Sequence, residues 1–235
     1  DINNGGKLTD TRETINGFPC RLILINDGDT PLQEGQQEPT GGNTKDMGVF
    51  NFNNDKSNTK TLGFDTDNFP FCASFEVASN SDTSAGAFMS YKGTGGKEKE
   101  LAYIKDSFEL RFPDEDDVGA DYGFLDMNGD STKGLKRVID FVDKSSDEDF
   151  IAHFEEYFNK QYTFRYFLLV MALGMVDNLG KNMMLDTWDG QIFYPRFYDM
   201  DTICSFNNSG VITFDTDIEM EQGYWNTSNS RLWTR

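Results

Sequence analysis

The sequence predicts an α+β fold with a β-rich first part, residues 1–100, and a mainly helical second part, residues 101–235. Two observations predict it. Short segments rich in aromatic and β-branched residues, separated by Gly, Asn and Asp turns, dominate the first part. From Lys133 onward the apolar residues recur with the period of a helix. We therefore expect a sheet-forming part followed by a helical one.

Strands are expected where apolar or alternating segments are bounded by turn residues. The first is 18–26 and its expected partner is 47–52, with the polar segment 30–46 as the loop between them. Further strands are expected at 71–77, 183–185, 191–194 and 196–198, and the segment 108–113 alternates between apolar and polar residues.

Three helices are expected to open the second part. The first is expected after Lys133, where the apolar residues take up the spacing of a helix. The second, 147–159, is capped by a serine at 145 or 146. The third, 162–176, is apolar on most sides, which predicts that it lies at the centre of the fold. The acidic run 114–117 that precedes them has the composition of a solvated loop.

The composition excludes several classes of function. Forty acidic residues against 21 basic ones give a formal net charge of −19, which repels nucleic acid and anionic lipid. The longest apolar run, 164–176, carries Arg165 and is shorter than the roughly 20 residues that span a bilayer. The cysteines lack the spacing of a zinc site, and the single histidine, His153, leaves little for a Ser–His or Cys–His nucleophile. We expect neither nucleic acid nor membrane as a partner.

Acidic and amide side chains follow apolar segments late in the chain. Asp177 and Asn182 have the five-residue offset of the aspartate and asparagine in a protein-kinase catalytic loop, and Asp199 follows a short expected hairpin, where the metal-binding aspartate comes. Phosphoryl transfer uses such groups to orient the attacking hydroxyl and to hold the metal ions that bridge the ATP phosphates. The same residue types also cap ordinary turns, so three turn caps around a buried helix are the alternative.

Asp177 is also expected at the C-terminal end of the third helix. An isolated carboxylate there opposes the helix dipole, at a cost of about 0.3–1 kcal/mol unless a cation or metal compensates. This unfavourable position favours a functional role for Asp177.

Three pieces of the chain, in order, carry a family resemblance. They are the hairpin segments 17–26 and 47–52, the helix pair that runs from 141–150 into 164–176, and the motifs 177–182 and 198–201, which are similar to the patterns D-x-x-x-x-N and W-D-x-D. With these pieces the chain resembles, over most of its length, the CotH family of spore-coat-type, atypical protein kinases.

The resemblance implies a two-lobed, protein-kinase-like (CotH-like) fold with a β-rich first lobe and a helical second lobe. It also implies a phosphotransferase that binds ATP with Mg²⁺ or Mn²⁺ and modifies Ser or Thr of a protein acceptor. By this resemblance Asp177 takes the place of the catalytic aspartate. The implied metal ligands are Asn182, Asp199 and, as an assisting carboxylate, Asp201.

The chain departs from the family pattern at points that bear on catalysis. Tyr198 stands where the family has tryptophan, and 202–205 does not match what usually follows. The lysine that pairs with the ATP phosphates is either Lys56, which is otherwise an exposed turn residue, or a residue before Asp1, since we expect the chain to be a piece of a longer protein. The sequence is therefore compatible with an active kinase and with a pseudokinase.

A second resemblance rests on residues 50–56, 176–182 and 198–202, the last followed by Asn207 and Asn208. These segments look like CotH-like modules inside structural proteins of tailed bacteriophages and prophages. In that setting the domain is a noncatalytic structural or host-attachment module of the phage tail. Its partners would be other subunits of the virion, and its location the virion; otherwise the protein would be bacterial.

A carbohydrate-binding β domain is the third alternative. It would be built on Trp188, Trp225 and Trp233. The three successive expected helices argue against it, because a compact lectin has little use for them.

Overall fold

The computed structural model describes residues 17–24, 45–53, 55, 62–77, 88, 108–119, 122–124, 127, 129–175, 178–179, 182–200, 202–205, 211 and 232–233. The chain divides into two compact units. One unit is Ile15–Lys56, and the other combines Asp1–Thr14 with Ser57–Arg235. We call the first the hairpin unit and the second the main unit.

The hairpin unit is an antiparallel pair of strands, β1 (Gly17–Leu24) and β2 (Lys45–Asn53). Both strands and their pairing confirm the sequence prediction; the expected connecting loop lies outside the described residues except at its last positions. Phe18 faces Phe52 across the ladder and Cys20 faces Phe50, so one face of the ribbon is apolar. Phe18 and Phe52 are 59% and 63% exposed. Nothing within this unit covers that face among its described residues.

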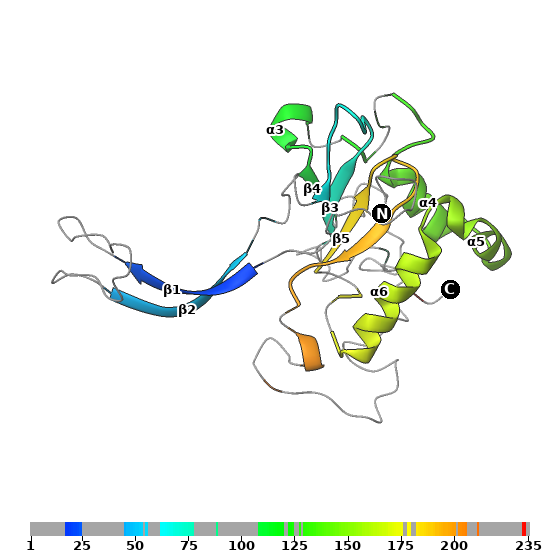
Figure 1. Ribbon diagram of the computed structural model, residues 1–235. Coiled ribbons are helices and arrows are strands. Elements are labelled where there is room, and N and C mark those ends of the chain that lie inside the picture. Colours follow the sequence, from blue (N-terminus) through cyan, green and yellow to red (C-terminus); the bar gives the residue numbers. More distant parts are fainter. Residues whose placement is uncertain are drawn as a thin grey trace, which may run out of the picture. The chain divides into compact units, whose positions relative to one another are not determined.

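The main unit contains a four-stranded antiparallel sheet in the order β4-β3-β5-β6 (Figure 1). Its strands are β3 (Ala73–Val77), β4 (Phe108–Phe112), β5 (Met183–Thr187) and β6 (Tyr194–Phe197). Strands β3 and β5 confirm the strands predicted at 71–77 and 183–185, and β4 occupies the alternating segment 108–113. The central pairing joins β3, from the first hundred residues, to β5, from the last sixty. The prediction that residues 1–100 and 101–235 form two lobes stays a prediction.

One strand prediction near the end of the sheet is wrong. The two short strands expected at 191–194 and 196–198 are the single strand β6, which pairs continuously with β5. Pro195 lies inside it, opposite Leu185. A proline is tolerated there because β6 is at the edge of the sheet, where one side of the strand needs no ladder hydrogen bonds.

The helices of the second part follow the predicted order with shifted ends. They are α4 (Leu135–Lys144), α5 (Asp147–His153), the 3-10 turn η2 (Phe154–Glu156) and α6 (Lys160–Ala172). Ser146 caps α5, as expected, by accepting a hydrogen bond from the Asp149 backbone N–H at 3.1 Å. The predicted helix 147–159 is regular only as far as His153. The acidic run, expected as a loop, contains the short exposed helix α3 (Glu115–Val118), which Asp114 caps.

Helix α6 differs from its prediction in position and in burial. It ends at Ala172, so Asp177 lies five residues beyond its last residue and the argument from the helix dipole does not hold. Only the stripe Thr163, Tyr166 and Val170 is buried, whereas Leu168 is 63% exposed. The helix therefore covers the sheet with one face and is not a central helix.

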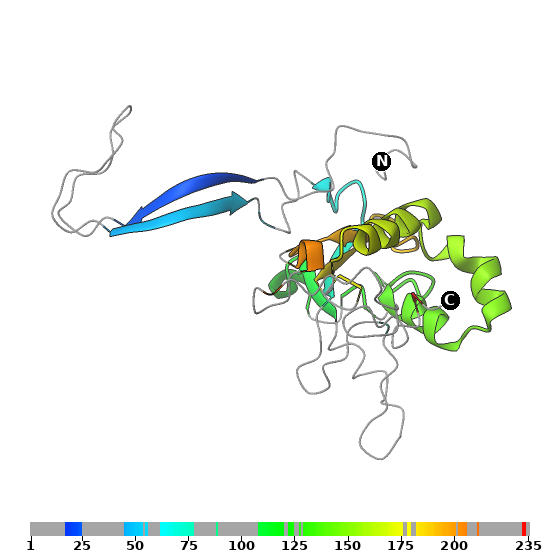
Figure 2. The same ribbon diagram turned by 90° about the horizontal axis from the view of Figure 1, so that it is seen from below.

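The core of the main unit lies between the sheet and the helices. Figures 1 and 2 show α6 running along the sheet, with α4 and α5 beyond its first turn. One apolar cluster joins inward side chains of β3 and β5, such as Phe75 and Leu185, to Val138 of α4 and Tyr166 of α6. A smaller cluster contains Leu62, Phe64, Cys72 and Trp188. The protein is thus α+β, and no helix in the described part is long and apolar enough to span a bilayer.

The smaller cluster encloses the thiol of Cys72. Cys72 is completely buried, and burial raises the pKa of its thiol to about 11. Because the thiolate is the reactive form, we expect Cys72 to resist alkylation by iodoacetamide at pH 8, whereas the exposed Cys204 is modified. Mass spectrometry of the labelled peptides checks this. Equal labelling of both cysteines in the native protein would contradict the burial of Cys72.

Candidate functional site

The β5–β6 hairpin brings two of the five predicted site residues together. Asn182 directly precedes β5 and Asp199 comes two residues after β6. Met183 faces Phe197 in the ladder, so the start of β5 and the end of β6 are neighbours. The side-chain amide of Asn182 lies 3.5 Å from the backbone carbonyl of Asp199. The other three predicted site residues, Lys56, Asp177 and Asp201, lie outside the described residues.

Both described candidates have an unusual backbone conformation. Asn182 has a φ of 54° and Asp199 a φ of 47°, in the left-handed region. Asn and Asp enter this region more readily than other non-glycine residues, which fits their presence here. Cys204 and Ser205, a few residues further on, also have positive φ. Such conformations cost of order 1–3 kcal/mol each and cluster at functional sites, where the surrounding structure holds them.

A buried amide, Asn178, joins the two candidate residues. Its Nδ2 donates to the backbone carbonyl of Asn182 at 2.6 Å and to that of Tyr198 at 2.9 Å. Asn178 is fully buried, and its own backbone carbonyl accepts a hydrogen bond from the Tyr166 hydroxyl at 2.7 Å. Sequence analysis missed Asn178. The available signal was an amide inside the 177–182 motif that carries the candidate loop, directly followed by the apolar Leu179.

Tyr166 connects this site to helix α6. Its ring stacks on Phe197 of β6, with the ring centroids 4.5 Å apart, and lies 6.0 Å from that of Trp233. Burial raises the pKa of the Tyr166 hydroxyl far above its ordinary value, so the group is a proton donor in its bond to Asn178 at any physiological pH. The side chain of Tyr166 on α6 therefore contacts both strand β6 and the loop that contains Asn178.

The segment after Asp199 is held against the end of α6. The backbone N–H of Cys204 donates to the carbonyl of Leu173 at 2.7 Å, and that of Ser205 to the carbonyl of Gly174 at 2.9 Å. These residues form the 3-10 turn η3 (Ile203–Ser205). Two carbonyls at the C-terminus of the helix thus find partners, and the chain beyond Asp199 returns to the helix that carries Tyr166.

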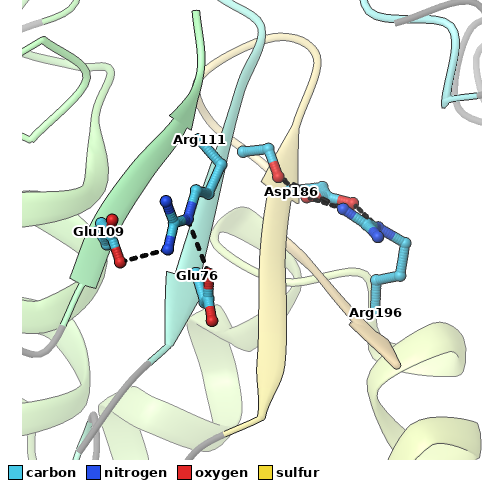
Figure 3. Close-up of polar contacts among 6 residues, drawn as sticks. Glu76, Glu109, Arg111, Asp186 and Arg196 are labelled. Carbon is cyan, nitrogen blue, oxygen red and sulfur yellow. Dashed lines mark hydrogen bonds and ion pairs between the residues drawn. The ribbon is translucent and has the colours of Figure 1, made fainter. Parts of the chain in front are cut away.

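A buried ion pair makes the hairpin rigid. Arg196 of β6 donates through Nε to Asp186 Oδ2 of β5 at 2.5 Å, and Ser74 of β3 donates to Asp186 Oδ1 at 2.5 Å. Figure 3 shows the guanidinium and the carboxylate pointing toward one another from the two strands. Both side chains are 2% exposed. These three polar side chains link β3, β5 and β6 on the face opposite Phe75 and Leu185.

The donor atoms at the site suit a hard divalent cation. Mg²⁺ takes oxygen ligands, usually one or two from the protein together with water and phosphate. The amide oxygen of half-buried Asn182 and the carboxylate of exposed Asp199 are such ligands. No group of three His, Cys, Asp or Glu side chains suited to a metal occurs among the described residues. Asn182 and Asp199 are therefore two candidate oxygen ligands whose backbones are neighbours, and the metal at this position stays a prediction.

Other residues singled out from the sequence are not at this site. His153 is on the surface, with its side chain 51% exposed and Nδ1 2.7 Å from Glu156 Oε1. Trp188 is buried in the smaller cluster, and Trp233 packs on α6 and donates to the Leu179 carbonyl. Trp188 is therefore enclosed and unsuited to stacking on a carbohydrate, whereas Trp233 is half-buried. Trp225 lies outside the described residues.

Comparison with known proteins adds no family to these observations. No protein-family model matches the sequence, and no curated protein is similar to it. The function is therefore argued from the residues and their geometry.

Proposed function

We propose that the protein has a two-lobed, kinase-like fold of the CotH type and transfers the γ-phosphoryl group of ATP to Ser or Thr of a protein. The observation that carries the proposal is the meeting of Asn182 and Asp199 at the end of the β5–β6 hairpin. The offsets that nominated them are those of a kinase catalytic loop and of its metal-binding aspartate. Residues with left-handed φ at both positions support a functional site.

The proposed roles follow from the chemistry of each side chain. Asn182 and Asp199 would hold Mg²⁺ or Mn²⁺, with Asp201 assisting, and the metal would neutralise charge on the ATP phosphates. Asp177 would orient the acceptor hydroxyl and take its proton, and Lys56 is the candidate partner of the phosphates. Catalysis of this kind needs positioning and charge stabilisation more than covalent chemistry. A rigid hairpin under Asn182 and Asp199 is suited to that task.

ATP-dependent thermal stabilisation tests the proposal. We expect millimolar ATP with Mg²⁺ or Mn²⁺ to raise the Tm of the chain, because ligand at 100 times its Kd stabilises by about 2.7 kcal/mol. Asp199→Asn should abolish the shift, since it removes the charge but keeps a residue that tolerates positive φ. Asp117→Asn is the matched control, because it removes one negative charge from exposed helix α3. ATP with EDTA should give no shift.

A second candidate function is a noncatalytic module of a phage tail. The observation that favours it is the apolar face of the hairpin unit, with Phe18, Phe50 and Phe52 exposed within that unit, as is common for surfaces buried on assembly. The same experiment separates the two functions. A folded sample without any ATP-dependent or metal-dependent shift would overturn phosphoryl transfer and leave the assembly module.

A further inference from the structure

We propose that Asn178 is a positioning residue of the phosphoryl-transfer site, which sets the backbone of both candidate metal ligands through one side-chain amide. This inference rests on the proposed function. Asn178 touches neither ATP nor metal in this proposal. It acts through Asn182 and Asp199.

The direction of the two hydrogen bonds follows from chemistry. The atoms next to the Asn178 amide are the carbonyl oxygens of Asn182 and Tyr198, which only accept. The side-chain group that faces them must therefore be the NH₂, which has two hydrogens to donate. One amide thus donates to two carbonyls from two separate segments. No other residue type of this size offers two donors and no net charge.

These two carbonyls determine how the candidate ligands are held. The Asn182 carbonyl belongs to the peptide plane that follows Asn182, and the Tyr198 carbonyl belongs to the plane that precedes Asp199. Fixing the two planes restricts ψ of Asn182 and φ of Asp199. Both residues have left-handed φ, which is costly unless surrounding contacts hold it. The Asn178 amide supplies such contacts at both positions simultaneously.

Asn178 is itself held in place. Its backbone carbonyl accepts from the Tyr166 hydroxyl, and the Tyr166 ring stacks with those of Phe197 and Trp233. The side chain is completely enclosed, so water does not compete for the Nδ2 hydrogens. A rigid chain of contacts therefore runs from α6 through Asn178 to both ligands. Supporting contacts of this kind typically change metal affinity or activity by 10–100-fold when they are removed.

The test compares Asn178→Ala with a variant that is destabilised at the start of α6, the helix that carries Tyr166. Asn159 caps the start of α6 by accepting from the Tyr162 N–H at 2.9 Å, and Asn159→Ala is expected to lower the Tm without touching the site. The measured quantity is the Mn²⁺ concentration at half of the ATP-induced Tm shift. We expect Asn178→Ala to raise it about tenfold or more. Asn159→Ala should leave it unchanged although its own Tm is lower.

Tyr166→Phe provides a second variant that removes a single oxygen atom. It keeps the ring packing and deletes only the hydrogen bond to the Asn178 carbonyl. We expect a smaller rise in the Mn²⁺ midpoint than for Asn178→Ala. If Asn178→Ala does not fold, this variant decides the question.

The outcomes distinguish the two proposals. Metal-dependent stabilisation of the unmodified chain with normal Mn²⁺ midpoints for Asn178→Ala and Tyr166→Phe would overturn the positioning role and leave the proposed function intact. An unmodified, folded chain that shows no metal-dependent ATP shift would overturn both. Raised Mn²⁺ midpoints in Asn178→Ala and Tyr166→Phe, with an unchanged Mn²⁺ midpoint in Asn159→Ala, would support the positioning role and the proposed function.

Discussion

Replacing Asp186 with alanine is expected to lower the free energy of unfolding by about 3–5 kcal/mol. The carboxylate accepts from Arg196 Nε at 2.5 Å and from Ser74 Oγ at 2.5 Å, and both members of the ion pair are 2% exposed. Its removal leaves a guanidinium enclosed by protein without this counter-charge, and water cannot replace it at that depth. Equilibrium unfolding in urea, with the slope m checked for two-state behaviour, measures the change.

The neighbouring pair in the same sheet provides the control. Arg111 of β4 bonds to Glu76 and to Glu109, and Glu109 is 50% exposed (Figure 3). Because water screens this contact, Glu109→Ala should cost no more than about 1 kcal/mol. A double change, Asp186→Leu with Arg196→Met, should recover most of the loss, since apolar residues of similar volume often replace a buried pair without penalty. A loss below about 1 kcal/mol for Asp186→Ala would show that the pair is hydrated.

Gly174→Ala is expected to destabilise the protein by about 2–4 kcal/mol and to disturb the end of α6. Gly174 has a φ of 60°, and the N–H groups of Gly174 and Met175 donate to the carbonyls of Met171 and Val170. This is the Schellman pattern that ends many helices. An added Cβ would overlap the Ser205 hydroxyl and lie 3.1 Å from the Ser205 backbone nitrogen. Thermal and urea unfolding measure the effect.

Two contributions to this effect can be separated. Gly129 has a φ of 77°, but a Cβ there would meet nothing within 4 Å. Gly129→Ala should therefore cost only the backbone contribution, about 1–2 kcal/mol. The difference between the two variants measures the contact of Gly174 with Ser205. Equal costs would mean that η3 moves away without penalty.

Local patterns predicted the regular elements well because their causes are local. Strands β1 and β2 follow from apolar segments between turn residues, and α5 from Ser146 followed by an amphipathic run. The errors occurred where long-range contacts set the result. Apolar residues on most sides of 162–176 predicted a central helix, yet α6 buries one stripe because only that side meets the sheet.

The part of the candidate site that depends on local sequence was predicted, and the part that depends on long-range contacts was not. Residue type and spacing nominated Asn182 and Asp199, and the hairpin between them brings them together. Asn178 and Tyr166 escaped notice because their roles depend on contacts across 20 and 12 residues of sequence. Nothing in the residues next to Asn178 specifies which carbonyls its amide will reach.

The sequence by itself determined most of the regular elements and a serine cap at 145 or 146 for α5, because propensity and capping are properties of short segments. It nominated Asn182 and Asp199 as ligands of a divalent cation from residue type and spacing alone. Only the tertiary structure decided that Asp186 meets Arg196. Their contact requires the register in which Met184 faces Arg196 and Asp186 faces Tyr194, so the two charged side chains lie diagonally on one face. A shift of one residue would put them on opposite faces of the sheet, and that choice is made by the packing of the whole unit.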